Sequence, residues 1–396
     1  MYFDRRLWDA TKGLRWRIAL GVVIGLLAAV AGLSRFALMG MLLAKVFADA
    51  PVEDLFLPAL SVASAVLLRG ILDHERVAVA NGTAALHIAA AAIDLKPGDR
   101  LWTSPNTFVA SANCARYLGA DVDFVDIDPR TYNLSVARLE EKLAVAAKAG
   151  RLPKVLVPVH FSGQSCEMAA IAALAKRHGI LVLEDAAHAI GARYRGQPVG
   201  SCAHSDLAIF SFHPVKIITT AEGRIVVTNR ADLYERLLLL RSHGITREPR
   251  LMDGASHGPW YYQQVELGWN YRLTDLQAAL GESQMNKLDA FVARRAALAR
   301  RYDELLKDLP LTLPWQHPDT ASAWHLYVIR LHTDRLKKSR CQIVEELRAA
   351  GIGVQIHYIP VHTQPYYRRL GFKDGDCPEA EKYYTETISQ IGRAHV

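Results

Sequence analysis

From Val77 onward the chain alternates between short apolar runs and longer stretches of helical periodicity, and this alternation limits the fold more than any other feature. The runs are rich in β-branched residues and read VAVA, VDFVDI, KVLVPV and ILVLED. Helical stretches at residues 134–149 and 166–178 lie between or beside them. Strands that alternate with helices usually form a mostly parallel sheet covered by helices. We therefore expect an α/β fold with a large, mostly parallel-sheet domain.

The chain beyond this region changes its pattern. Residues 274–309 carry apolar residues at helical spacing and predict one or two long helices that end before Pro310. HLYVIRL (residues 325–331) and GVQIHY (residues 353–358) predict strands on either side of a helix over residues 343–350. We expect a large domain over residues 76–250, and long helices with a smaller, truncated C-terminal α+β domain over residues 251–390.

The first 75 residues have a different character. Residues 18–33 contain no charged residue, residues 55–68 form a second apolar run, and several basic residues precede the first run. This pattern is typical of a membrane segment under the positive-inside rule, and a buried core helix is the alternative. We expect residues 1–75 to form a hydrophobic helical segment, with membrane association only through it.

Composition limits the partners. The net charge is +7, but Lys and Arg are scattered and do not form runs interleaved with aromatic residues, so we expect no nucleic-acid partner. The five cysteines are far apart and include no C-x-x-C pair. This usage favours a reduced, cytoplasmic location for the chain from residue 76 onward and predicts no metal site.

The turn Asn81-Gly82-Thr83-Ala84 lies between a short predicted strand and a stretch of residues that favour helix. A helix that begins at this turn would direct free backbone N–H groups at an anion, and Gly82 would allow a close approach. An ordinary helix cap is the alternative. The turn predicts a phosphate site only in combination with other groups.

Three further residues supply such groups. Phe108 follows a turn and begins a helix, where its ring could stack on a planar heterocycle or simply pack in the core. Asp185 ends an apolar strand, where a carboxylate could keep a pyridine nitrogen protonated, and His188 follows it. In SFHPVK a strand delivers Ser211 and the next turn carries Lys216, and a lysine buried near other cations can lose its proton and attack an aldehyde. The ordered set predicts a pyridoxal 5′-phosphate (PLP) site with Lys216 as the Schiff-base lysine.

The motifs NGTAALH, TSPNTFVASAN, EDAAHAIGA, SFHPVK and GWNYRLTDLQAAL occur in this order between residues 77 and 390. In these motifs the chain resembles the DegT/DnrJ/EryC1/StrS family of PLP-dependent nucleotide-sugar aminotransferases. The resemblance implies the type I fold of PLP-dependent transferases. IHYIPVHTQPYY and SFHPVK look most like the branch of pseudaminic acid synthesis, which implies glutamate as amino donor and a UDP-linked 4-keto-6-deoxy-N-acetylhexosamine as substrate.

The resemblance also implies residue roles. Thr83, Ala84 and Ser211 would hold the phosphate, and Phe108 would cover the ring. Asp185 would pair with the pyridine nitrogen, His188 would lie near the phenolic oxygen, and Lys216 would carry the proton. Asn270 would reach the phosphate of the neighbouring subunit's cofactor, which implies a homodimer with shared sites. His357 and Tyr358 would contact the nucleotide sugar.

Some positions depart from the family pattern. Ile217 stands where this branch usually has proline, and Ala221-Glu222-Gly223-Arg224 replaces a glycine-rich GEGG, so that Arg224 brings a bulky side chain close to the site. Residues 2–74 resemble an ABC exporter membrane region, and residues 391–396 resemble a translated sequencing adapter. The departures at the two ends predict a chimeric frame joined near residues 72–78, and such a truncated chain could be inactive.

Two alternatives to this aminotransferase stay open. One is a related family member, either another nucleotide-sugar aminotransferase or a sugar dehydratase, although the dehydratases carry histidine in place of the lysine at position 216. The other is a membrane transport fragment, which rests on the first seventy-odd residues alone. The chain contains no GxxxxGK[ST] loop, so it cannot be a complete ABC transporter.

Overall fold

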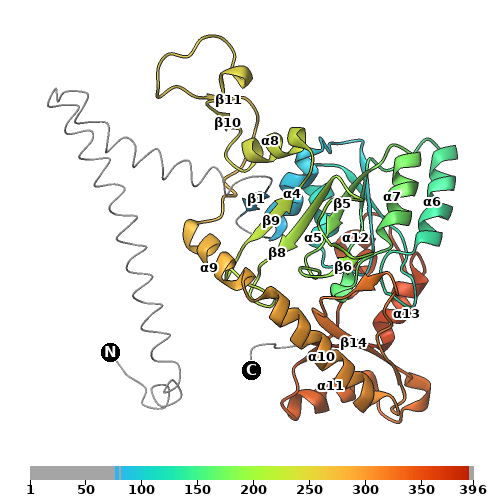
Figure 1. The fold of residues 1–396 in the computed structure, drawn as a ribbon. Helices are drawn as coiled ribbons and strands as arrows, with labels where there is room; N and C mark the ends of the chain where they lie inside the picture. The colour runs from blue at the N-terminus through green and yellow to red at the C-terminus, as the bar shows by residue number, and fades with distance from the viewer. Residues whose placement is uncertain (1–75, 80–81, 392–396) are drawn as a thin grey trace, which may run out of the picture. The chain divides into compact units, whose positions relative to one another are not determined.

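A seven-stranded sheet forms the centre of the computed structural model, which describes residues 76–79 and 82–391 (Figure 1). Its strand order is β1-β9-β8-β5-β4-β2-β3. The strands are β1 (Arg76–Val79), β2 (Arg100–Thr103), β3 (Asp121–Phe124), β4 (Val155–Val157), β5 (Leu181–Asp185), β8 (Leu207–Ser211) and β9 (Arg224–Val227).

Five neighbouring strands of this sheet are parallel, and β9 runs antiparallel to both β8 and β1. In the register, Leu183 of β5 lies opposite Leu207 of β8, and both are fully buried. The expected mostly parallel α/β sheet is confirmed. Because the parallel strands point the same way, their carboxyl ends meet along one edge of the sheet.

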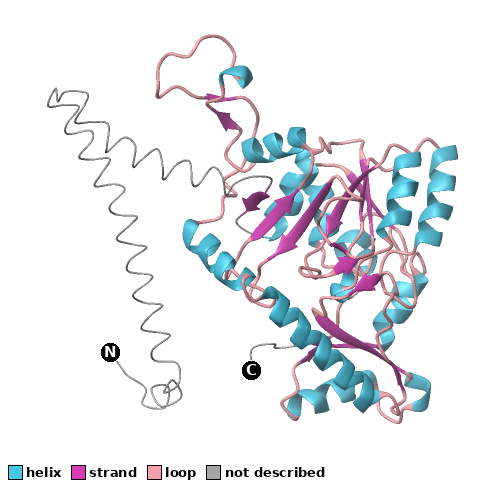
Figure 2. Ribbon diagram, viewed as in Figure 1, coloured by secondary structure: helices cyan, strands magenta, loops and turns pink. Residues whose placement is uncertain are grey.

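Helices cover the two faces of this sheet (Figure 2). They are α4 (Gly82–Ala92), α5 (Ala110–Tyr117), α6 (Val136–Lys148), α7 (Met168–Arg177) and α8 (Ala231–Leu240). The predicted helices over residues 134–149 and 166–178 correspond to α6 and α7, each slightly shorter than expected. Helix α6 begins where it does because the Ser135 side chain accepts a hydrogen bond from the Arg138 backbone N–H.

A second, antiparallel sheet has the order β12-β14-β16-β15 and includes β14 (Leu326–Leu331), which lies within the expected strand over residues 325–331. Its other strands are β12 (Leu311–Thr312), β15 (Val354–Gln355) and β16 (Thr387–Ile391). The strand expected over residues 353–358 keeps only two residues in the sheet, because the chain then leaves it toward the carboxyl edge of the large sheet. The boundary between residues 250 and 251 stays a prediction.

The long helical region divides into two helices, α9 (Asp275–Met285) and α10 (Leu288–Leu306). Thr274 begins α9 with a capping box, in which its hydroxyl and the Gln277 side chain bond reciprocally to the backbone. Within the described residues, the other strands and α-helices are β6 (Arg193–Tyr194), β7 (Gln197–Pro198), β10 (Ile245–Thr246), β11 (Gln263–Gln264), β13 (Thr320–Ala321), α11 (Arg340–Ala349), α12 (Pro365–Arg368) and α13 (Pro378–Glu386). Strands β10 and β11 form the base of an arm that extends from α8 (Figure 1).

Two sequence-based predictions fall outside the described residues. These are the hydrophobic segment over residues 1–75, with its exporter resemblance, and the tail that follows Ile391. Within residues 76–79 and 82–391, no helix is both long and apolar enough to cross a membrane.

Candidate active site

A cavity of about 790 Å³ opens at the carboxyl edge of the large sheet, where β5 ends at Asp185 and β8 ends at Ser211. Ligands of open α/β sheets bind at such edges. The cavity brings together most of the predicted site residues, and it omits Ala84 and Asn270. Those that line it are Thr83, Phe108, Asp185, His188, Ser211, Lys216, His357 and Tyr358.

Lys216 lies in the turn that follows β8, and its side chain lines the cavity. Its backbone N–H donates to the His213 carbonyl at 2.9 Å, and the next two residues, Ile217 and Ile218, are each 1% exposed. Ile217 therefore anchors the turn in the core. Burial and the nearby Arg224 guanidinium lower the pKa of Lys216 to about 7, against the opposing effect of Asp185. A large fraction of this lysine is therefore a neutral nucleophile near neutral pH.

Asp185 is held by two hydrogen bonds. Its Oδ2 accepts from the Ser111 hydroxyl at 2.6 Å, and its Oδ1 accepts from the Ala187 backbone N–H at 3.1 Å. The Ser111 hydroxyl also lies 2.8 Å from the Thr107 hydroxyl, which lines the cavity. The carboxylate is 5% exposed and is therefore fixed in orientation at the cavity wall.

His188 lies beside Asp185 on the cavity wall and is neutral. Burial, followed by the positive charge of Lys216, lowers the pKa of His188 well below its usual value. Its Nδ1 accepts from the Ser162 backbone N–H at 3.3 Å, so the proton is on Nε2, which lies 3.2 Å from the Tyr358 hydroxyl. The Tyr358 ring also stacks on the His188 ring, with centroids 6.2 Å apart.

His357 lines the same cavity and follows β15, a strand of the antiparallel sheet. The Ser389 hydroxyl donates to the Gln355 carbonyl at 2.8 Å, and its oxygen lies 2.6 Å from His357 Nδ1. The Nδ1 atom therefore carries the proton, and Nε2 is left as an acceptor. Burial, followed by the charge of Lys216, lowers the pKa of His357 to about 4. The pair His357 and Tyr358 thus offers the cavity neutral polar groups.

The groups predicted to hold the phosphate and the ring lie at different parts of the wall. Thr83 lines the cavity from the first turn of α4, and Ser211 lines it from the end of β8. Ala84 is buried in the hydrophobic core, so only its backbone could serve an anion. Phe108 is 56% exposed, and its ring centroid lies 6.4 Å from that of Tyr358. A ring this exposed at a cavity mouth is available for stacking on a ligand.

Asn270 lies outside the cavity and is exposed. Its neighbours Trp269 and Tyr271 stack on each other with centroids 5.9 Å apart, and the His87 ring of α4 lies 4.4 Å from Trp269. Because alternate residues of an extended segment point to opposite sides, the inward packing of Trp269 and Tyr271 leaves Asn270 pointing outward. The predicted role of Asn270 needs a second subunit and stays a prediction.

Several residues that line the cavity or contact its lining could not be predicted from the sequence. Thr107 and Ser111 belong to TSPNTFVASAN, but only the fold shows that their hydroxyls lead to Asp185. His325 lies 4.4 Å from the His188 ring, centroid to centroid, and precedes β14 by one residue. No sequence signal pairs residues this far apart along the chain. Arg224 was noted only as an obstruction.

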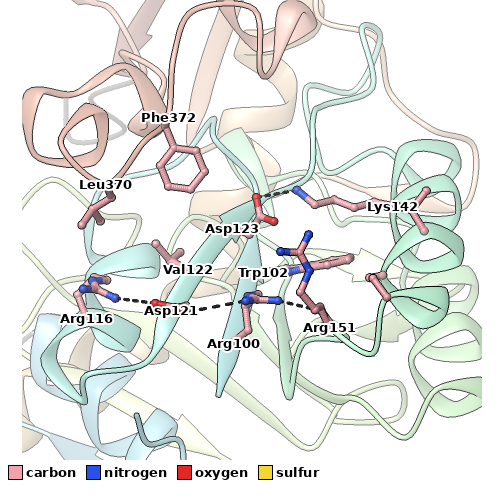
Figure 3. A pocket seen from close by; sticks show the side chains of 13 residues that line it. Arg100, Trp102, Arg116, Asp121, Val122, Asp123, Lys142, Arg151, Leu370 and Phe372 are labelled. Carbon is pink, nitrogen blue, oxygen red and sulfur yellow. Dashed lines mark hydrogen bonds and ion pairs between the residues drawn. The ribbon is translucent and has the colours of Figure 1, made fainter. Parts of the chain in front are cut away.

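A second hollow, of about 390 Å³, lies against β2 and β3 and has a different character (Figure 3). Arg100 and Asp121 begin these strands, so the hollow lies toward the opposite end of the sheet from Asp185. Its charges are largely paired, because Lys142 Nζ lies 2.7 Å from Asp123 and Arg116 lies 3.4 Å from Asp121 (Figure 3). It contains none of the predicted site residues.

The residues of the larger cavity fit PLP. The group is a planar aldehyde with a pyridine nitrogen and a phosphate. The cavity offers a lysine with lowered pKa for the aldehyde, a fixed carboxylate for the nitrogen, and an exposed aromatic ring for the planar face. Thr83, Ser211 and the first turn of α4 supply donors for the phosphate. Fold and site together define an α/β enzyme with the architecture of type I PLP-dependent transferases.

Comparison with known proteins gives the family. The model of the DegT/DnrJ/EryC1/StrS aminotransferase family matches residues 70–391. The Bacillus subtilis spore coat polysaccharide biosynthesis protein SpsC is 39% identical over 316 residues, which cover 79% of each chain. The chain therefore belongs to the DegT/DnrJ/EryC1/StrS aminotransferase family, whose members depend on PLP.

Solved structures share the fold. Helicobacter pylori PseC, an aminotransferase involved in the biosynthesis of pseudoaminic acid, superposes with a TM-score of 0.72 at 31% identity, covering 81% of this chain and 82% of PseC. S. venezuelae DesV superposes with a TM-score of 0.70 at 33% identity, covering 81% of this chain and 80% of DesV. A Streptococcus pneumoniae protein solved in its PLP form gives a TM-score of 0.70 at 27% identity, covering 80% of this chain and 81% of that one.

Proposed function

We propose that the chain transfers an amino group from glutamate to the 4-keto carbon of a UDP-linked 6-deoxy-N-acetylhexosamine, as in pseudaminic acid synthesis. The observation that carries the proposal is the joint placement of Lys216 and Asp185 on one cavity wall, with the lysine pKa lowered to about 7. A neutral amine and a fixed carboxylate that line one cavity are what amino transfer requires of the protein. The likeness to PseC supports the sugar, and the glutamate donor rests on the family resemblance.

Bound PLP would supply an electron sink that stabilises negative charge at the donor's α-carbon. Asp185, fixed by Ser111 and Ala187, would hold the pyridine nitrogen in its protonated form. Phe108 would cover the open face of the ring. Lys216 Nζ would take the proton from the donor's α-carbon and later deliver a proton to the carbon that receives the amine.

The neutral histidines would serve the sugar nucleotide. His357 Nε2 is an acceptor, and the Tyr358 hydroxyl lies against His188 Nε2, so the wall presents acceptor and hydroxyl groups without a net charge. Such groups suit the hydroxyl and acetamido groups of a hexosamine, which are neutral donors and acceptors. A pocket of this kind distinguishes hydroxyl orientations by hydrogen bonding.

The active enzyme in this proposal is a homodimer with shared sites. Large apolar side chains are exposed on the arm and on α9, among them Trp260 at 70%, Leu267 at 77% and Leu276 at 86%. These residues lie on both sides of Asn270 in the sequence, and large exposed apolar side chains are typical of a protein interface. A partner subunit bound there would bury this surface close to Asn270. The outward-pointing Asn270 would then reach the phosphate of the PLP held by the partner subunit. We further propose a cytoplasmic location for this enzyme.

The substrate is tested with the purified chain, PLP, glutamate and the UDP-4-keto sugar, with the product followed by mass spectrometry and NMR. We expect 2-oxoglutarate and a UDP-4-amino sugar in equal amounts. A 3-keto nucleotide sugar and an epimer of the UDP-4-keto sugar serve as matched controls. Preference for either control would overturn the substrate assignment while leaving the family activity in place.

A further inference from the structure

Arg224 places a guanidinium in the wall of the active-site cavity, although it was noted in the sequence only as a bulky substitution in a glycine-rich motif. It begins β9 and is 8% exposed. In the antiparallel register it lies directly opposite Ser211, the last residue of β8, and both side chains line the cavity. Residues directly opposite on neighbouring strands have side chains on the same face, with Cβ atoms about 5 Å apart.

The guanidinium lacks partners for much of its hydrogen-bonding capacity. Its Nε and Nη1 atoms are buried and have no hydrogen-bond acceptor within residues 76–79 and 82–391. Two carboxylates of the cavity, Asp185 and the exposed Glu222, attract it, but both oxygens of Asp185 already accept hydrogen bonds from Ser111 and Ala187. A buried cation with unused N–H groups is costly unless a ligand completes its hydrogen bonds.

Its neighbours add to this cost. Lys216 lines the same cavity, and the two positive charges repel each other. The neighbouring His188 and His357 are neutral and therefore cannot offset a positive charge. An anion in the cavity would relieve the repulsion and accept from the free N–H groups at once, and the planar fork of arginine suits an oxyanion with two or more oxygens.

We propose that Arg224 is an oxyanion-binding residue of this active site. The proposal rests on the proposed function, which brings two oxyanions into the cavity, namely the phosphate of PLP and the carboxylates of glutamate. Arg224 lies opposite Ser211, at the end of the cavity that would hold the phosphate, and its attraction to Asp185 connects it with the side that would hold the ring. A phosphate and a carboxylate are both oxyanions, so Arg224 would bind either one by the same kind of hydrogen bond. The family motif has glycine here, so this site would be particular to chains that carry the arginine.

The test uses the full chain as wild type and as Arg224→Met, Arg224→Lys and Arg224→Gly, with Arg138→Met on the exposed surface of α6 as the control. Dissociation constants are measured by absorbance and by calorimetry for PLP, for pyridoxal, which lacks the phosphate, and for glutarate, which is a dicarboxylate without the amine. If Arg224 binds the phosphate of PLP, Arg224→Met should raise the dissociation constant for PLP on the order of ten- to a hundredfold and leave that for pyridoxal unchanged. If Arg224 instead binds a carboxylate of glutamate, the same variant should lose a similar amount of affinity for glutarate and none for PLP. In both cases Arg224→Lys should recover part of the loss.

Unchanged binding of both oxyanions in Arg224→Met and Arg224→Gly would overturn the proposal, and so would tighter PLP binding by the glycine variant, which would make Arg224 an obstruction. Failure of the proposed function has a separate signature, because the wild type would then take up no PLP on Lys216. Wild-type uptake with unchanged variants therefore rejects only the inference about Arg224.

Discussion

The Ser111 hydroxyl, at the start of α5, donates to Asp185 Oδ2, at the end of β5, over 2.6 Å. The two residues are 74 positions apart in the chain and meet because both elements reach the carboxyl edge of the sheet. The contact fixes the carboxylate proposed to face the pyridine nitrogen. Ser111 is thus a positioning residue, which acts through Asp185.

Ser111→Ala should lower kcat for amino transfer about tenfold, because a charge-assisted hydrogen bond to a buried carboxylate is worth roughly 1.5–3 kcal/mol, only part of which reaches the transition state. The KM for glutamate should change less than kcat. Ser165→Ala is the matched control, since Ser165 is also buried and its hydroxyl donates to the Cys166 carbonyl outside the cavity. Equal losses in both variants, or a change in KM alone, would assign Ser111 a purely structural role.

The rate at which Lys216 reacts with PLP should depend on pH with a midpoint near 7, the lowered pKa of its amine. Below this pH the ammonium form dominates and the rate falls about tenfold per unit, and above it the rate should level off. Arg224→Met should move the midpoint upward, because the guanidinium disfavours the charged lysine. Stopped-flow absorbance measures the profile. A rate that keeps rising to pH ~10 would indicate an ordinary solvated lysine.

Ala221 should be more stable as glycine. It adopts φ +65°, a left-handed conformation that costs a residue with a Cβ roughly 1–2 kcal/mol, and it is exposed, so no packing is lost. After the entropy cost of glycine in the unfolded chain, Ala221→Gly should raise the free energy of unfolding by up to about 1 kcal/mol. Ala144→Gly, at an exposed position inside α6, should lower it by about 1 kcal/mol. Urea denaturation measures the free energy of unfolding of both variants. A change of the same sign in both would reject the strain at Ala221.

The proposed dimer predicts that Leu276→Glu gives a monomer, because burying a charge in an apolar interface costs more than the contact returns. Leu305→Glu, at a residue 64% exposed on α10, should leave the oligomeric state unchanged. Sedimentation velocity measures both. Two variants with the same mass, either both dimeric or both monomeric, would place the interface elsewhere.

Shared sites can be tested by mixing inactive subunits. Lys216→Ala and Asn270→Ala chains, unfolded together and refolded, should recover about a quarter of wild-type activity, since half of the dimers are mixed and each has one complete site. No recovery above the two parents would mean that Asn270 serves no partner site.

The sequence was most informative where a functional residue ends a strand. Asp185 and Ser211 could be placed at one edge because parallel strands end together, and this geometry follows from alternation alone. The order of motifs then related Lys216 to them. These inferences needed only local pattern and a general rule of sheet architecture.

Contacts between distant segments could not be predicted in the same way. Tyr358 meets His188 across 170 positions because the chain leaves β15 early, and no local pattern predicts where a short strand ends. Arg224 was interpreted as an obstruction because its burial and its lack of acceptors depend on packing from β1, β8 and the Asp185 strand. Side-chain environments of this kind are properties of the tertiary fold.

Borohydride treatment of the PLP-loaded protein, followed by mass spectrometry of the labelled peptide, shows directly whether PLP is bound to Lys216. We expect label on Lys216, none in Lys216→Ala, and loss of label when glutamate is added before the reductant. Label spread over exposed lysines such as Lys96, or label on Lys216 that glutamate does not remove, would contradict an aminotransferase site at this residue.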